Sequence, residues 1–192
     1  NMVRNLNNHR VLVTGGTGYL GARIGKHLAD HGYDVCLGSR NPFSNGKVEA
    51  CNQVMTNWDD PEYKFCDGFD LIIHSAGMNA YDCTQNPSFA NHFNGKTTGY
   101  FAQKAALYGC KRFIYLSTVH VYKSPLVGDF DEQSPSLNDH PYATSHYSGE
   151  EHALGVSKNT SLDVVVLRLS NSFGYPLTRQ TACWDLVLNQ FI

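Results

Sequence analysis

Three glycines near the amino end of the chain have a spacing that suits phosphate binding. Gly15, Gly18 and Gly21 follow the apolar run 10–14 and open a helical pattern. In a strand–turn–helix unit, the first glycine permits the tight turn and the second lets the backbone approach a pyrophosphate. The third lets the helix pack closely on the strand, and the helix N-terminus favours the anion. A turn needed only for packing explains one glycine but not three, so the pattern predicts a dinucleotide-binding loop.

The end of the second expected strand bears on which dinucleotide binds. An acidic residue there, about 20 residues past the glycines, would hold the ribose hydroxyls of NAD. This chain has Ser39 and Arg40 instead, and no Asp or Glu lies between Val35 and Lys47. An arginine beside a hydroxyl suits a 2′-phosphate by its charge and its planar donors. The sequence therefore favours NADP over NAD, unless Arg40 is only a solvated surface residue.

Apolar strands that alternate with helices must position these residues. Near-continuous apolar strands between helices indicate a parallel sheet that is buried on both faces. Because crossovers between parallel strands are right-handed, the fold class is α/β, a doubly wound parallel sheet of the Rossmann-like type. Strands are expected over 10–14, 34–39, 70–76, 112–117 and 162–169, with a weaker one near 48–54, and helices over about 18–31, 87–108 and 142–156.

Composition and charge restrict the class of protein. The chain has 192 residues, of which 42% are hydrophobic and 17% are charged, which favours a packed core over disorder. Lys and Arg number 15 and Asp and Glu 17, so no basic excess suggests nucleic acid or an anionic membrane. No apolar run approaches the roughly 18 residues of a spanning helix. The polar start, 2–9, has no signal-peptide core, so we expect a cytoplasmic protein.

Metal and disulfide chemistry find no pattern in the sequence. No two cysteines form a Cys-x-x-Cys pair, and no His-Glu-x-x-His arrangement occurs. We therefore expect no metal site and reduced, buried thiols. The cysteines are Cys36, Cys51, Cys66, Cys83, Cys110 and Cys183.

Several further motifs, in a fixed order, give the chain a family resemblance. They are the segments 70–77 (DLIIHSAG), 111–122 (KRFIYLSTVHVY), 141–146 (PYATSH) and 167–174 (LRLSNSFG). With the glycine loop, they resemble the extended short-chain dehydrogenase/reductase superfamily. The closest branch is the NAD-dependent epimerase/dehydratase group, which acts on nucleotide sugars. The resemblance runs from about Arg10 to Gly174.

The resemblance implies roles for individual residues. Tyr142 matches the catalytic tyrosine, Thr118 the catalytic Ser/Thr, and Asn171 a position that often touches substrate; His120 is a further candidate for contact with substrate. The cofactor-binding positions are Gly15, Gly18, Tyr19 and Leu20 on the pyrophosphate, Asn57 and Trp58 beside the adenine, Ser75, Ala76 and Gly77 at the ribose, and Asn94, Tyr142 and His146 beyond them, in addition to Ser39 and Arg40.

Elementary chemistry agrees with the two catalytic assignments. Hydride transfer at a carbinol or carbonyl carbon needs an acid or base on the oxygen, and a phenol serves if its pKa of about 10 is lowered. A hydroxyl donor such as Thr118 would hold the same oxygen. Tyr142 begins a helix after a turn-rich loop, so it is expected to point into the cleft above the strands.

The chain departs from the family pattern at the fourth residue after Tyr142. The family has lysine there, whereas this chain has His146. A spacing of four puts both side chains on one helix face. A histidine with a pKa of about 6.5 is mostly neutral at pH 7. We therefore expect a working but pH-sensitive site in which His146 forms a hydrogen bond or relays a proton. The competing interpretation is a degraded site that binds the dinucleotide without turnover.

A second departure concerns the type of reaction. The family's dehydratases place an Asp-Glu pair directly after the catalytic threonine, and here the pair is Val119-His120. An epimerase or simple reductase is therefore favoured over a dehydratase. The open alternatives are a non-catalytic dinucleotide-binding or redox-sensing module and a reductase of a carbonyl metabolite unrelated to sugars.

The expected domain organisation follows from the motifs. Residues 1–9 form an N-terminal extension, 10–180 the Rossmann domain, and 181–192 the start of an incomplete C-terminal substrate region. The expected partner is a small-molecule substrate, which the resemblance implies is a nucleotide sugar. A homodimer is left open as an alternative to a monomer. The final amphipathic stretch, Trp184 to Ile192, has no C-cap signal, so we expect that a substrate-capping region is missing.

Overall fold

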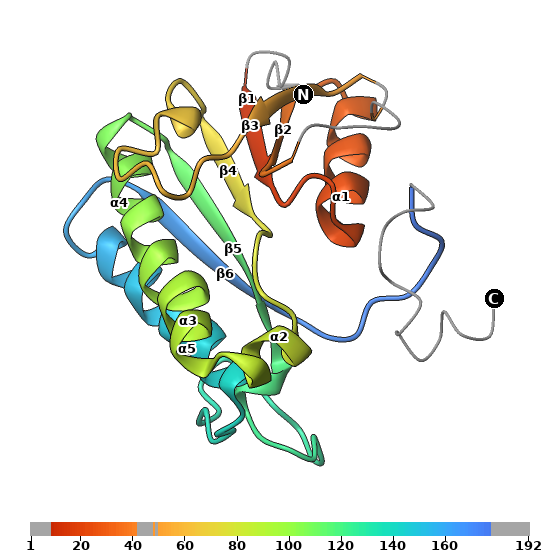
Figure 1. Ribbon diagram of the computed structural model, residues 1–192, viewed down its shortest axis with the longest axis vertical. Coiled ribbons are helices and arrows are strands. Elements are labelled where there is room, and N and C mark those ends of the chain that lie inside the picture. Colours follow the sequence, from red (N-terminus) through yellow and green to blue (C-terminus); the bar gives the residue numbers. More distant parts are fainter. Residues whose placement is uncertain (1–8, 42–47, 49, 178–192) are drawn as a thin grey trace, which may run out of the picture.

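A six-stranded parallel sheet organises residues 9–41, 48 and 50–177, which are the part of the chain that the computed structural model describes (Figure 1). The strand order is β3-β2-β1-β4-β5-β6. The order reverses between β1 and β4, and open α/β sheets bind ligands at the carboxyl ends of the strands beside such a reversal. The strands are β1 (Arg10–Thr14), β2 (Asp34–Ser39), β3 (Asn52–Met55), β4 (Leu71–His74), β5 (Arg112–Thr118) and β6 (Asp163–Leu169).

Helices cover both faces of the sheet, with α1 on one face and α4 and α5 on the other (Figure 1). This arrangement confirms the doubly wound α/β fold. The helices are α1 (Tyr19–Asp30), α2 (Ala80–Gln85), α3 (Pro87–Ala90), the π-helix η3 (Asn91–Thr97), α4 (Thr98–Leu107) and α5 (Pro141–Ser157), with 3-10 turns η2 (Lys64–Cys66) and η4 (Val119–Val121).

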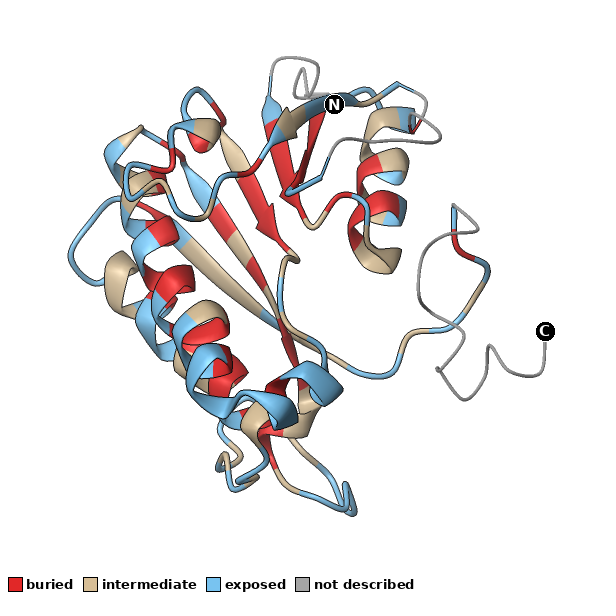
Figure 2. Cartoon of the chain, in the orientation of Figure 1, coloured by how far each residue is buried: buried red, intermediate tan, exposed pale blue. Residues whose placement is uncertain are grey.

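The alternation of side chains along β1 explains the two cores. Val11 and Val13 pack with Ala22 of α1, whereas Leu12 packs with Phe101 of α4 on the opposite face. Successive side chains of a strand point to opposite faces, so an apolar strand must be covered twice. Val11, Leu12 and Val13 have no exposed surface, and buried residues follow the central strands (Figure 2).

The segment 87–108 differs from the single α-helix expected there. It consists of α3, the π-helix η3 and α4 in succession. A π-helix has a wider turn than an α-helix and is frequent at functional sites. Apolar spacing over seven residues does not distinguish the two periods, so the sequence analysis missed it. The wider turn contains the buried residue Asn94.

Two short elements also differ from expectation. The helix α2 was not foreseen, although Asn79 precedes it and caps it by accepting a hydrogen bond from the backbone of Asp82. Asn86 caps α3 in the same way, with Pro87 in the first helical position. Asparagine caps and an initial proline are the signals that could have found both helices. β3 begins at Asn52, later than the weak strand expected near 48–54.

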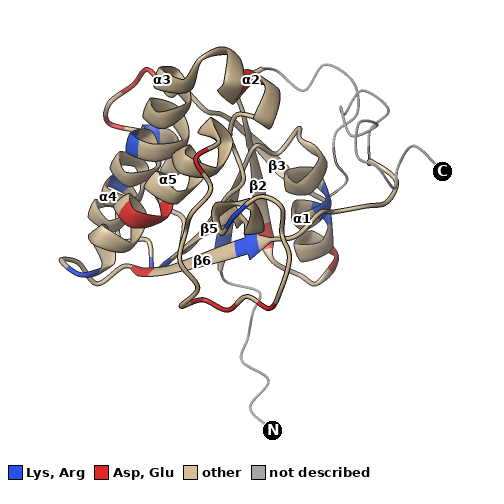
Figure 3. Cartoon of the chain, turned by 90° about the horizontal axis from the view of Figure 1, so that it is seen from below, with Lys and Arg blue, Asp and Glu red and all other residues tan. Residues whose placement is uncertain are grey.

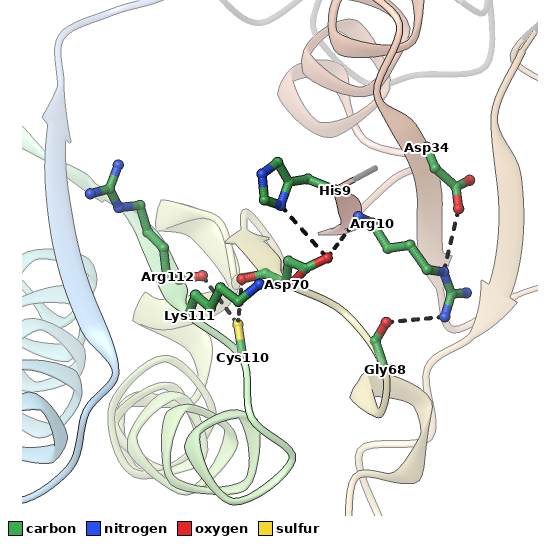
Figure 4. A network of polar contacts seen from close by, with 8 residues as sticks. All are labelled: His9, Arg10, Asp34, Gly68, Asp70, Cys110, Lys111 and Arg112. Atoms are coloured by element: carbon green, nitrogen blue, oxygen red, sulfur yellow. Dashed lines mark hydrogen bonds and ion pairs between the residues drawn. The ribbon is translucent and has the colours of Figure 1, made fainter. Parts of the chain in front are cut away.

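The amino ends of the strands carry a network of ion pairs (Figure 4). Asp70 accepts hydrogen bonds from the Nζ of Lys111 at 2.7 Å and from the backbone of Arg10 at 3.2 Å. The side chain of Arg10 lies 3.4 Å from Asp34 and donates to the carbonyl of Gly68. These contacts lie at the opposite edge from the carboxyl ends of the strands, so we assign them to stability.

We expect Asp70→Asn to lower the free energy of unfolding by about 1 kcal/mol or less at pH 7, because the pair with the exposed Lys111 is solvent-screened. The Lys111 ammonium lowers the pKa of Asp70 in the fold. A carboxylate with a lowered pKa stabilises above its unfolded pKa of about 4 and loses this effect as pH falls. The difference in free energy of unfolding between the two proteins in urea should therefore hold from pH 7 to about pH 5 and narrow as the pH falls below about 4. An unchanged difference would contradict this assignment.

Charges of both signs are interspersed over the molecule (Figure 3), in keeping with the net charge of −2. No helix in the described ranges is long and apolar enough to cross a membrane. The five described cysteines are unpaired, and all except Cys51 are buried, which confirms that part of the expectation. Three expected features lie outside the described residues: Cys183, residues 1–8 of the expected extension 1–9, and the expected C-terminal region 181–192.

Candidate dinucleotide and catalytic site

The glycine loop has the geometry that its spacing predicts. Gly15 has φ +67°, and a side chain there would meet the backbone of Ser75 and Ala76 at 3.0 Å. At Gly21 an added Cβ would lie 2.3 Å from the carbonyl oxygen of Gly15. The first and third glycines are therefore required by the turn and by close packing.

Gly18 and the start of α1 are open in a way that fits an anion. An added Cβ at Gly18 would meet only the carbonyl oxygen of Gly15, at 3.0 Å. Gly18 is the N-cap of α1, and no side chain in the described part of the chain caps it. The backbone N–H groups of Tyr19 and Leu20 are in the first turn, where a helix offers no internal acceptor. The loop therefore fits a pyrophosphate.

The end of β2 places Ser39 and Arg40 differently. Ser39 is buried, with its hydroxyl 3.4 Å from that of Thr17 and accepting from the backbone of Asn41. Arg40 is exposed and lines a hollow of about 370 Å³ together with Gly77. Arg40 is thus available to an anion at the adenosine end of the loop.

The end of β3 carries the residues expected beside adenine. Asn57 is exposed and accepts a hydrogen bond from the backbone of Asp59. The indole of Trp58 is half-buried and packs edge-on against Phe93 and Phe101, with ring centroids 5.6 and 5.3 Å apart. Trp58 therefore belongs to an aromatic cluster of the core as well as to this edge of the sheet.

The segment after β4 is tied to the glycine loop. The hydroxyl of Ser75 donates to the carbonyl of Thr14 at 2.8 Å, and the backbone of Ala76 donates to the Thr14 hydroxyl at 3.3 Å. Gly77 is exposed, and a side chain there would lie 3.4 Å from Asn94 and 3.7 Å from the Nε2 of His146. These contacts bring the expected ribose residues to Asn94 and His146.

Asn94 joins that segment to α5. Its side-chain oxygen accepts from the backbone of Met78 at 2.8 Å, and its Nδ2 donates to the hydroxyl of Ser145 at 3.1 Å. Ser145 donates in turn to the carbonyl of Tyr142 at 3.0 Å. The amide of Asn94 therefore joins α5 to the segment after β4.

Tyr142 and Thr118 meet at the carboxyl end of β5. Burial raises the pKa of the Tyr142 phenol, and a hydrogen bond with the Thr118 side chain acts in the opposite direction. Thr118 is buried and also caps η4 by accepting from the backbone of His120 at 3.2 Å. The pair is placed to share one oxygen of a substrate.

His146 lies directly beside Tyr142, with ring centroids 4.3 Å apart. Its Nδ1 is 3.0 Å from the carbonyl of Tyr142, which can only accept, and 3.5 Å from the Nδ2 of Asn94, which can only donate; the shorter contact favours the tautomer with the proton on Nδ1. Its Nε2 is then a hydrogen-bond acceptor on the side of Gly77. Burial lowers the pKa of His146 to about 4. The expected change of charge near pH 7 is therefore moved to acidic pH.

The two expected substrate residues lie at the same edge. His120 is half-buried in η4, and its carbonyl accepts from the side chain of Asn138 at 2.7 Å. Asn171 is exposed, two residues beyond the end of β6. Their contact with a substrate stays a prediction.

The sequence analysis missed a buried ion pair beneath the site. Glu150, 2% exposed, accepts from the Nε and Nη2 of Arg168 at 3.1 and 2.7 Å and from the hydroxyl of Ser117. The Arg168 guanidinium lies 4.7 Å from the ring centroid of Tyr122. Glu150 is four residues after His146, a helical spacing that could have indicated a shared face. The pair links α5, β5 and β6.

A second buried group was also missed. His74 at the end of β4 has its Nδ1 2.7 Å from the Thr14 hydroxyl and its Nε2 3.2 Å from the Thr98 hydroxyl. Burial lowers the pKa of His74 to about 3, so it is neutral. Thr98 donates to the carbonyl of Asn94. His74 therefore connects the strand edge to the π-helix. The described residues contain no cluster of three or more metal-binding side chains.

Comparison with known proteins decides the family. A family model described as the NAD dependent epimerase/dehydratase family matches residues 11–191. The chain belongs to this family. The match includes the glycine loop and the edge that carries Thr118, Tyr142 and His146, and members of the epimerase/dehydratase family are enzymes.

Curated relatives in the epimerase/dehydratase family include both kinds of enzyme. UDP-arabinose 4-epimerase 1 of Arabidopsis thaliana is 28% identical, over 85% of this chain and 43% of its own length. The dTDP-glucose 4,6-dehydratase of Streptomyces niveus is 28% identical, over 86% of this chain and 54% of its own. The chain thus spans about half the length of these relatives.

Solved structures agree with the epimerase/dehydratase assignment. A UDP-glucose 4-epimerase of Thermotoga maritima, solved with UDP-glucose, is 26% identical with a TM-score of 0.74, over 86% of this chain and 56% of that one. MoeE5, solved with UDP-glucuronic acid and NAD, is 18% identical with a TM-score of 0.81, over 94% and 59% of the two chains. The second likeness supports the Rossmann-like fold alone.

Proposed function

We propose that this chain is the dinucleotide-binding part of an NAD(P)-dependent epimerase or reductase that acts on a nucleotide-linked sugar. The observation that carries the proposal is the meeting of Tyr142, Thr118 and His146 at the same sheet edge as the open glycine loop. The relatives are named as enzymes of UDP-sugars and of dTDP-glucose. A nucleotide sugar is therefore the proposed substrate class.

The chain's own residues divide the work at the reacting oxygen. A bound dinucleotide supplies hydride exchange at the carbon. Thr118 would orient the sugar oxygen by a hydrogen bond, and the Tyr142 phenol would give the oxygen its proton or remove it. Thr118 is buried, which strengthens its hydrogen bond with Tyr142.

The proposed role of His146 differs from that of the lysine found at this position in the family. Its unprotonated Nε2 can accept a hydrogen bond from a ribose hydroxyl on the side of Gly77. It brings no positive charge at pH 7, because burial holds its pKa at about 4. In this role His146 orients the ribose without stabilising a tyrosinate by charge.

An epimerase or reductase is supported over a dehydratase at one position. Thr118 is followed by the turn η4, whose residues are Val119, His120 and Val121. That turn has no carboxylate that could take a proton from carbon. The resemblance implies that the family's dehydratases need such a carboxylate at this position.

A non-catalytic dinucleotide-binding module is the second candidate. The neutral His146 favours it, because a phenol whose pKa is raised by burial is a poor base. A redox sensor that works through a thiolate has less support. Burial raises the pKa of Cys36 and Cys110 to about 11, so these thiols stay protonated.

Native mass spectrometry and turnover together test the proposed function. We expect the purified chain to retain or bind one NAD(P)(H), because the loop fits a pyrophosphate. A panel of UDP- and dTDP-sugars should then yield an epimer or a change in nicotinamide absorbance. Binding without turnover of any sugar would favour the non-catalytic module, and no binding would reject the proposal.

We further propose NADP as the dinucleotide, with NAD, which is bound in structures of similar proteins, as the alternative. Arg40→Ala should weaken NADP(H) binding about tenfold or more and leave NAD(H) binding nearly unchanged, since one charge-assisted contact to a phosphate contributes about 1.5–3 kcal/mol. Titration calorimetry measures both affinities. Lys158→Ala, at an exposed helix end, is the control. An equal effect on both dinucleotides would contradict the preference.

A further inference from the structure

The chain after β6 turns back to the first turns of α1 at the carboxyl edge of the sheet (Figure 1). The hydroxyl of Tyr19 donates to the carbonyl of Gly174 at 3.1 Å. The guanidinium of Arg23 donates to the carbonyl of Tyr175. The two contacts thus join residues that are separated by 155 and by 152 positions in the sequence.

This contact is closely fitted. Gly174 has φ +123°, and a Cβ there would lie 3.1 Å from the Nη1 of Arg23 and 3.5 Å from the Tyr19 hydroxyl. Only glycine therefore permits the approach without strain. The Arg23 guanidinium also lies 5.5 Å from the ring centroid of Tyr19, which helps to orient the phenol.

The two ends of the contact carry different parts of the proposed site. Tyr19 directly follows Gly18, the open N-cap expected to face the pyrophosphate. Gly174 lies three residues after Asn171, the expected substrate contact. Asn171 itself is exposed, so the tie at Gly174 is what anchors its segment to the dinucleotide loop.

We propose that Tyr19 and Arg23 are positioning residues that couple dinucleotide binding at the glycine loop to ordering of the segment 170–175, and thereby to binding of the nucleotide sugar. This inference rests on the proposed function. A dinucleotide that fixes the first turn of α1 also fixes the phenol and guanidinium that hold Gly174 and Tyr175. The second ligand then meets a segment that is already ordered, which gives positive coupling without further contacts.

Hydrogen–deuterium exchange on the 192-residue chain tests the coupling. In the parent, NADP or NAD should slow exchange at the glycine loop and at 170–175. In Arg23→Met, and in Gly174→Ala, which puts a Cβ against the Arg23 guanidinium, the loop should still be slowed whereas 170–175 should not. Tyr33→Phe, three residues after the end of α1, is the control and should behave as the parent does.

Affinity for uridine diphosphate is the second readout. We expect saturating dinucleotide to raise it about fivefold or more in the parent and Tyr33→Phe, and less than about twofold in the other two variants. Slowed exchange at the loop alone in the parent, or coupling retained in both variants, would overturn the inference. No effect of dinucleotide anywhere would reject the proposed function and the coupling together. Faster exchange at 170–175 in the unliganded Arg23→Met would then still report the contact itself.

Discussion

Tyr142→Phe should lower turnover of a nucleotide sugar by at least about 100-fold, because a positioned general acid–base contributes roughly 10²–10⁴. The substitution removes only the phenolic oxygen, which bonds with Thr118. The packing of the ring on His146 is kept. Steady-state turnover, with dinucleotide affinity from titration of nicotinamide fluorescence, checks the prediction.

The dinucleotide affinity of Tyr142→Phe should stay within about fivefold of the parent, since losing one hydrogen bond costs about 1 kcal/mol or less. Tyr147→Phe, five residues along the same helix, is the control and should turn over normally. Undiminished turnover in Tyr142→Phe would exclude Tyr142 as the acid–base.

His146→Lys should move the ascending limb of the pH–rate profile, where Tyr142 loses its proton, to lower pH by about one unit or more. In the described part of the chain, the neutral hydroxyl of Thr118 is the group that lowers the pKa of Tyr142 against the effect of burial. An ammonium within a few ångströms favours the tyrosinate, and one pKa unit corresponds to about 1.4 kcal/mol of differential interaction. Turnover at pH 7 should rise about tenfold. Rates measured from pH 6 to 10 give the profile.

Two variants separate charge from shape in this experiment. His146→Gln keeps a neutral hydrogen-bonding side chain and should keep the parent profile. His152→Lys places the same ammonium at an exposed position on α5 and should also leave the profile unchanged. If His146→Lys, His146→Gln and His152→Lys share one pH–rate profile, the charge at position 146 does not control the pKa of Tyr142. If none turns over any sugar while the dinucleotide binds, the non-catalytic module becomes the better account.

The strands and the glycine loop were predictable because their signals are local. Apolar runs such as 11–13 are long enough to show a buried strand, and three glycines at fixed spacing identify the turn. The π-helix around Asn94 was not predictable, because a single wide turn leaves the apolar pattern almost unaltered. The caps Asn79 and Asn86 were readable but were not used.

The candidate site was only partly predictable for a different reason. Motif matching found Thr118, Tyr142 and His146, which the structure brings together. It gave His146 an ordinary pKa, because burial depends on neighbours that are distant in sequence. The pairing of Glu150 with Arg168 has the same origin, since β6 and α5 meet only in the fold.

The two sealed imidazoles, His74 and His146, make the folded domain sensitive to acid. Both have pKa values depressed by burial, to about 3 and about 4, whereas a histidine in the unfolded chain has a pKa of about 6.5. Below that pH the unfolded chain takes up two protons that the folded chain refuses, so stability falls as pH is lowered. We therefore expect mild acidification to lower the free energy of unfolding through two side chains that lie at the site where the chemistry is proposed to occur.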